Sequence, residues 1–167
     1  MNLVKLGEGV FRLDAGTDYF GNLQTTVSYF DIYRLNTNDV RELYISPQFS
    51  AIGDRALPFQ HLERLHLPTG IRKLGHAIFF YCMPERGYIE VIYQGTSGQF
   101  AALATPFREE VRIEEAGEYD RQPYCITQDT EYRYEVQERR FDASVAACRV
   151  LCADGVTLYY GYKERTP

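Results

Sequence analysis

The chain has 167 residues, of which 45% are hydrophobic and 25% are charged, and it contains 14 Tyr and 10 Phe but no Trp. This composition excludes wholesale disorder, and a chain of this length buries about 70% of the surface that its unfolded form exposes, so that it needs neither disulfides nor a metal to fold. The net charge of −5 arises within residues 84–167, where 15 Asp and Glu outnumber 10 Lys and Arg. This acidity disfavours duplex nucleic acid and anionic membranes as partners, because both attract basic surfaces.

The N-terminal part of the chain carries the alternating apolar and polar pattern of strands. Residues 4–13 predict a β-ribbon, and residues 25–35 predict a longer strand. Residues 36–39 have the composition of a hairpin turn that leads into a further strand over 40–46. We therefore expect neighbouring strands in this part to pair in antiparallel.

Residues 47–75 interrupt the strand pattern, since they contain three Pro and three Gly. Within them, 58–67 begins with a Pro and predicts a short helix. We interpret the segment as an insertion that lies over one end of the sheet, and long connections often carry functional residues. Phe59, His61 and His66 are candidate binding residues for this reason.

The middle of the chain, residues 76–95, contains two runs of aromatic and β-branched residues around a turn at 84–87. This pattern predicts a long antiparallel hairpin at the centre of the sheet. In the second run Tyr88, Glu90 and Ile92 lie on the more exposed face. That face, beside the insertion, is where we expect a partner to bind.

The C-terminal part predicts strands over 108–115, 132–137, 144–152 and 156–163, and the last two flank an Asp-Gly pair that favours a two-residue hairpin turn. Residues 99–107 fit a strand and a helix equally well. About eight to ten strands with turns every ~8–12 residues predict one all-β, mainly antiparallel domain with one short helix, folded as a barrel or a two-sheet sandwich. We recognise no internal repeat.

The sequence contains no complete catalytic or metal-binding constellation. His61 and His66 are five residues apart, which places them on different sides of a helix. Cys148 and Cys152 share one face of a strand or helix, but their spacing matches neither redox nor structural zinc motifs. We therefore predict no catalytic residue, no metal and no cofactor.

The excess of Tyr favours a non-catalytic binding protein over an enzyme, because Tyr is enriched at interfaces. We expect a rigid β scaffold that docks another protein through exposed Tyr and Phe and through acidic loops. The partner would be a protein with a basic surface or a second copy of this chain. It would act as a subunit of a larger assembly or as an inhibitor- or immunity-type partner. Tyr159 and Tyr162, in a C-terminal stripe of Tyr, are further candidate binding residues.

Two other function classes stay open. One is a β-barrel that binds a small apolar ligand, and the other is an enzyme with a His and Cys site or paired carboxylates. The N-terminus lacks the apolar core of a signal peptide, and no apolar run approaches the ~20 residues of a membrane span. We accordingly expect a cytoplasmic protein with reduced cysteines.

Overall fold

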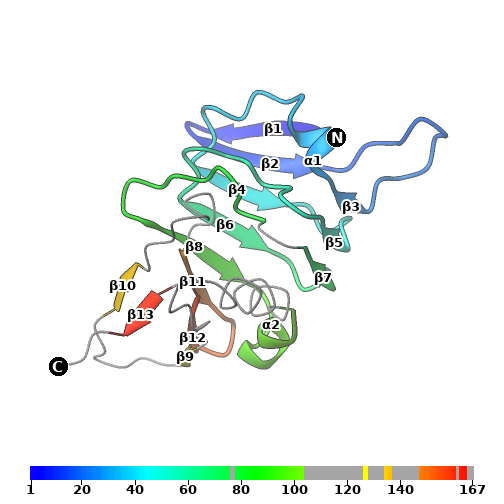
Figure 1. Cartoon of the computed structure of the whole chain (residues 1–167). Helices are drawn as coiled ribbons and strands as arrows, with labels where there is room; N and C mark the ends of the chain where they lie inside the picture. Colours follow the sequence, from blue (N-terminus) through cyan, green and yellow to red (C-terminus); the bar gives the residue numbers. More distant parts are fainter. Residues whose placement is uncertain (76–77, 104–125, 128–133, 137–146, 161, 165–167) are drawn as a thin grey trace, which may run out of the picture.

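The computed structural model describes residues 1–75, 78–103, 126–127, 134–136, 147–160 and 162–164, and two sheets dominate it (Figure 1). The larger sheet has eight strands, which are, in spatial order, β1 (Asn2–Gly7), β2 (Val10–Asp14), β4 (Glu42–Ile45), β6 (Arg64–Leu67), β8 (Tyr88–Tyr93), β11 (Ala147–Leu151), β12 (Thr157–Tyr160) and β9 (Ile126–Thr127). The smaller sheet has three strands, β3 (Thr26–Val27), β5 (Ala51–Ile52) and β7 (Lys73–Leu74). The other described elements are the helices α1 (Tyr29–Ile32) and α2 (Ser97–Leu103) and the paired strands β10 (Tyr134–Val136) and β13 (Tyr162–Glu164).

Between β2 and β8 the chain follows a superhelical path, and each turn of this path contributes one strand to each of the two sheets. Strands β2, β4, β6 and β8 pair in parallel, and β3, β5 and β7, which alternate with them along the chain, form the smaller parallel sheet. Leu43 lies opposite Leu65 in one sheet and Ile52 lies opposite Leu74 in the other, an offset of 22 residues in both. This part of the chain is a short β-solenoid, in which each turn packs on its neighbours.

This architecture contradicts the predicted fold class. We predicted a mainly antiparallel barrel or sandwich, but the larger sheet is mixed and the smaller sheet is parallel. Alternation of apolar and polar residues indicates that a strand has one buried face, but it carries no information on the direction of the neighbouring strand. The sequence shows no regular repeat because the turns of the solenoid differ in length. Leu13 lies opposite Ile45, an offset of 32 residues, whereas the later turn has an offset of 22.

A single apolar core joins the two sheets. One row of buried side chains crosses the larger sheet in register and consists of Leu43, Leu65, Val91, Val150 and Leu158. Val27, Ile52 and Leu74 of the smaller sheet are equally buried and belong to the same cluster. Because the turns stack in register, apolar side chains at equivalent positions contact each other, and the core is continuous along the solenoid.

The strand predicted over 25–35 is wrong beyond its first residues. It ends after Val27, and α1 begins with Ser28 as its N-cap. The Ser28 hydroxyl donates a hydrogen bond of 2.6 Å to the Asp31 carboxylate, and the Asp31 N–H lies 3.4 Å from the same hydroxyl oxygen. This local capping arrangement overrides the β pattern of the aromatic residues that follow.

The segment 47–75 forms a turn of the solenoid rather than an insertion, and the helix predicted over 58–67 is wrong. Strands β5, β6 and β7 lie within the segment. In β6, the buried Leu65 and Leu67 alternate with half-buried polar residues, which is the pattern of a strand. Pro68 directly follows β6, so it ends the strand instead of excluding one.

The antiparallel hairpin predicted over 76–95 is also wrong. Residues 78–81 form turns that bury Phe79, and Tyr81 has a positive φ of 66°. The second predicted strand matches β8, but β8 pairs in parallel with β6 and β11. A turn does lie at 84–87, but the described residues before it, 78–83, place Ile78, Phe79 and Cys82 in the core and do not pair with β8.

Two hairpins that depend on local signals are confirmed. Strands β1 and β2 pair in antiparallel, as the pattern over 4–13 predicted. Strands β11 and β12 form the hairpin predicted from Asp154 and Gly155, and Gly155 has the positive φ of 80° that favours Gly in such turns. The strand predicted over 108–115 lies outside the described residues.

Within the predicted range 99–107, residues 99–103 belong to helix α2, and the rest lie outside the described residues. The Gln99 N–H donates to the Thr96 hydroxyl at 3.2 Å, and the Thr96 N–H donates back to the Gln99 side chain at 2.8 Å. This reciprocal pair is a capping box, Thr-x-x-Gln, which the sequence already contained as a signal for a helix start.

We expect Leu65→Ala to lower the free energy of unfolding by about 3 kcal/mol, because it removes a fully buried side chain from the middle of the larger sheet and leaves a cavity. Leu23→Ala, where the side chain is largely exposed, should change it by less than about 0.5 kcal/mol. Urea unfolding followed by circular dichroism measures both values. Equal losses in the two variants would contradict the assignment of the core.

Candidate functional site

The face of the larger sheet that points away from the core carries a regular set of polar and aromatic side chains, which we call the outer face. Each of its residues alternates along its strand with residues of the core. The outer face consists of Glu42, Tyr44, Arg64, His66, Tyr88, Glu90, Ile92 and Arg149.

A row of four alternating charges crosses the outer face. Glu42, Arg64, Glu90 and Arg149 lie side by side on successive strands. Arg64 Nε donates to Glu90 Oε1 at 3.0 Å, and Arg149 Nη2 donates to Glu90 Oε2 at 2.6 Å. Arg64 Nη1 also lies 3.9 Å from Glu42 Oε1. Each carboxylate therefore lies beside a guanidinium group, which holds the row in one arrangement.

Glu90 is the most buried charge of the row, since its side chain is only 9% exposed. Burial raises the pKa of the Glu90 carboxyl, but the hydrogen bonds and charges of Arg149 and Arg64 outweigh it, so that the pKa lies below its ordinary value. Glu90 is thus a carboxylate at neutral pH, and its two arginine partners offset the cost of burying it.

A second rigid unit lies at the Glu42 end of the row. His66 Nε2 is 2.6 Å from Glu42 Oε1, and the His66 ring stacks on Tyr44 with ring centroids 3.8 Å apart and planes inclined by 4°. Tyr44 and His66 are opposite each other on β4 and β6. The stack therefore presents a flat aromatic surface whose orientation is fixed by the hydrogen bond between His66 and Glu42.

Tyr88 extends the aromatic surface on β8. The guanidinium carbons of Arg86 and Arg149 lie 4.5 Å and 5.5 Å from the centroid of its ring, which is the range of cation–π contacts. Arg86 also donates to the backbone carbonyls of Glu63 and Tyr88. Its positive charge therefore lies at the edge of the outer face, bonded to neutral acceptors.

A groove of about 150 Å³ lies where the chain enters the parallel strands. It is lined by Glu8, Gly9, Val10, Arg41, Glu42, Glu63, Arg64 and Arg86. Three carboxylates and three guanidinium groups thus surround it. Its volume is below the ~300 Å³ at which pockets for small-molecule ligands begin, so it suits a single side chain rather than a ligand or cofactor.

The structure places four of the predicted binding residues on the outer face, namely His66, Tyr88, Glu90 and Ile92. Ile92 lies opposite His66 and next to the charged row.

The other four predicted residues lie elsewhere. Phe59 is completely buried in the core, and His61 is half-buried in the connection between β5 and β6. The backbone register places Tyr159 opposite Arg149, and it places Tyr162 opposite Val136 in the separate strand pair.

Sequence analysis did not single out Tyr44, Arg64 and Arg149. A signal for the first two exists, because the segments Glu42–Ile45 and Arg64–Leu67 have the same alternation of polar and apolar residues at the 22-residue offset. Arg149 comes from a strand far along the chain, and only its pairing with β8 brings it to Glu90.

Cys82 lacks the surroundings of a nucleophile. Its thiol is buried and donates a hydrogen bond of 3.0 Å to the Leu57 carbonyl. Burial raises the pKa of this thiol to about 12. Within the described part of the chain, no group of three or more His, Cys, Asp and Glu side chains is arranged to hold a metal ion.

We expect Glu90→Gln to lower the free energy of unfolding at pH 7 by about 2 kcal/mol, because it removes the charge that two guanidinium groups share. The folded-state pKa of Glu90 is depressed, so its contribution is present above the ordinary Glu pKa of about 4.3 and is lost as the pH falls through the lower folded value. The difference between wild type and variant should therefore shrink below about pH 4. Urea titrations at several pH values test this.

Glu85→Gln, at an exposed position of the 84–87 turn, is the matched control and should leave the stability within about 0.5 kcal/mol at neutral pH. A Glu90→Gln difference that stays constant from neutral to acid pH would contradict the proposed role of the Glu90 charge.

We also expect Cys82 to resist alkylation by a maleimide in the folded protein at pH 7.5, because the thiolate is the reactive form and both burial and the raised pKa suppress it. The same reagent should label Cys82 in urea. Mass spectrometry of the peptide that contains Cys82 measures the extent of labelling, and equal rates in both states would contradict the buried thiol.

No described helix is long and apolar enough to cross a membrane. No protein-family model matches the chain, and no curated protein and no solved structure is significantly similar to it, so its function has to be inferred from its own geometry.

Proposed function

We propose that the chain is a non-catalytic scaffold that docks another protein on the outer face of its larger sheet. The observation that carries this proposal is the charged row with its aromatic stack, in which two ion pairs and the hydrogen bond between His66 and Glu42, all 2.6 to 3.0 Å long, hold side chains of four strands in one orientation. A surface that is ordered before binding loses little side-chain entropy when a partner binds. Solenoids commonly use such extended surfaces for recognition.

The chemistry of the outer face favours an acidic or carbonyl-rich segment as the docked part of the partner. Glu90 is paired with Arg64 and Arg149, and Glu42 contacts His66 and lies beside Arg64, so both carboxylates already have partners within the face. A guanidinium group has five N–H donors, and the contacts of Arg64 with Glu90 and Glu42 involve two of its three nitrogens. The face therefore offers donors and flat rings, which suit carboxylates, backbone carbonyls and apolar side chains.

The groove beside Arg64 would receive one side chain of the docked segment. Its volume of about 150 Å³ is too small for a separate ligand, and it adjoins the charged row through Glu42 and Arg64. A docked strand or loop that crosses the row could place a side chain in it. This feature supports protein docking over the binding of a small molecule.

We expect the double variant Tyr44→Ser/Ile92→Ser to weaken capture of the partner at least about tenfold, because aromatic and apolar anchors dominate protein interfaces. The measurement is a native pull-down with the immobilised chain, followed by mass measurement of the intact complex. Lys73→Ser, an exposed substitution on the smaller sheet, is the matched control and should leave capture unchanged.

Circular dichroism of each variant checks that the fold is retained, so that a loss of capture reports on binding and not on unfolding. If the wild type captures no partner of defined stoichiometry, or if the outer-face variant and the Lys73 variant bind equally well, the proposal is wrong.

A further inference from the structure

The N-terminal end of the solenoid exposes a set of large apolar side chains, which we call the N-terminal surface. The exposed fractions reach 96% for Tyr19, 83% for Phe20 and 74% for Phe30. The surface comprises Leu6, Tyr19, Phe20, Tyr29, Phe30 and Tyr33. All of them come from β1 or from the first turn of the solenoid. The terminal turns of solenoids normally have a polar outer side. The apolar outer side at this end therefore indicates that another molecule binds there.

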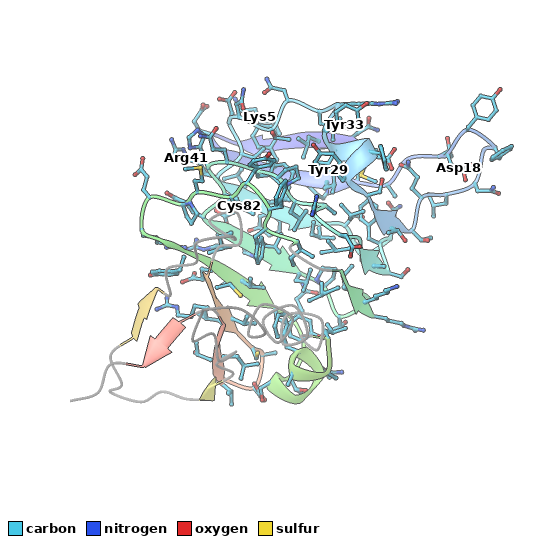
Figure 2. All side chains as sticks on the ribbon, viewed as in Figure 1. Lys5, Asp18, Tyr29, Tyr33, Arg41 and Cys82 are labelled. Carbon is cyan, nitrogen blue, oxygen red and sulfur yellow. The ribbon has the colours of Figure 1, made fainter. Side chains whose placement is uncertain are left out.

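The aromatic residues of this surface are held in place by local contacts. On α1 the rings of Tyr29 and Tyr33 stack with centroids 5.8 Å apart. In the loop between β2 and β3, the Asp18 carboxylate accepts hydrogen bonds of 2.9 Å from the N–H groups of Phe20 and Asn22. Figure 2 shows Tyr29 and Tyr33 at the same end of the molecule as Lys5 of β1, and Asp18 on a loop that projects from the body.

The same end presents a free sheet edge. Strand β1 is the last strand of the larger sheet, and within the described residues no strand pairs with its outer side. Its only charged residue is Lys5, and Leu6 beside it is half exposed. An edge strand with so little charge is a template for pairing with another strand.

We propose that a second copy of this chain docks on the N-terminal surface, with the two β1 strands paired in antiparallel about a two-fold axis and the α1 aromatics packed beside them. A two-fold axis brings the same edge of both copies together, so that each edge strand supplies the partner of the other. The charged residues of β1, of α1 and of the turns beside them are Lys5, Glu8, Asp18, Asp31 and Arg34, which include both signs. This mixture suits self-association better than a strongly acidic or basic partner.

The exposed area is sufficient for a stable dimer when the projecting loop that carries Tyr19 and Phe20 also packs against the second copy. A Phe or Tyr side chain offers about 150–250 Å² for burial, so the exposed parts of these six side chains amount to something on the order of 700 Å². One side of a standard protein interface buries about 800 Å². The backbone of β1 supplies the remainder.

The test is the mass of the chain in solution. We expect sedimentation velocity and light scattering to give twice the 19.3 kDa of one chain at about 100 µM protein. Phe30→Ser/Tyr33→Ser should raise the dissociation constant at least about tenfold, since it removes two aromatic anchors. Met83→Ser removes an equally exposed apolar side chain outside the N-terminal surface and should leave the dimer intact.

Phe30→Glu serves as a second variant, and circular dichroism of each variant checks that the fold is retained. A wild-type chain that is monomeric at the highest concentration overturns the proposal. So does a dimer that resists both variants at position 30, or one that Met83→Ser dissociates as readily. Because the outer face is not involved, this result and that of the pull-down are independent of each other.

Discussion

Parallel stacking of strands in register is the constraint on which the rest of the structure depends. Strands lie about 4.8 Å apart, so a residue at a given position of one turn lies directly beside its counterpart in the next. Inside, this places Leu43 on Leu65 and keeps the core continuous. Outside, it places Glu42 beside Arg64 and Arg64 beside Glu90. Side chains of like charge in such a row would repel each other. Because the charges alternate in sign, neighbouring side chains attract each other and stabilise the sheet.

Polar contacts join the connections that follow β8 and β11. Asp154 accepts hydrogen bonds from the N–H and hydroxyl of Ser97, and Ala153 donates to the Gly95 carbonyl. The hydrogen bonds from Ser97 lower the pKa of Asp154, so the link involves a carboxylate. At the β1 edge of the sheet, by contrast, large aromatic side chains lie exposed.

The candidate site could be predicted in part. Tyr88, Glu90 and Ile92 follow from the alternation within one strand, because that pattern identifies the face that points away from the core. The same alternation within β4 places Tyr44 on an outward face, but that Tyr44 and Arg149 belong to the same surface as Glu90 could not be predicted. The strand pattern is local, and it contains no information on which distant strand lies alongside or in which direction it runs.

By itself, the sequence determined the features that depend on a few adjacent residues. These include the β1–β2 ribbon, the hairpin at Asp154 and Gly155, and the positions of β4 and β8 along the chain. Only the tertiary structure decided that β4 and β8 run parallel and that the outer face is one surface. The physical reason is that parallel pairing requires the chain to return after a whole turn, and that return depends on burying side chains such as Ile52 and Leu74 in a core that no single segment can form.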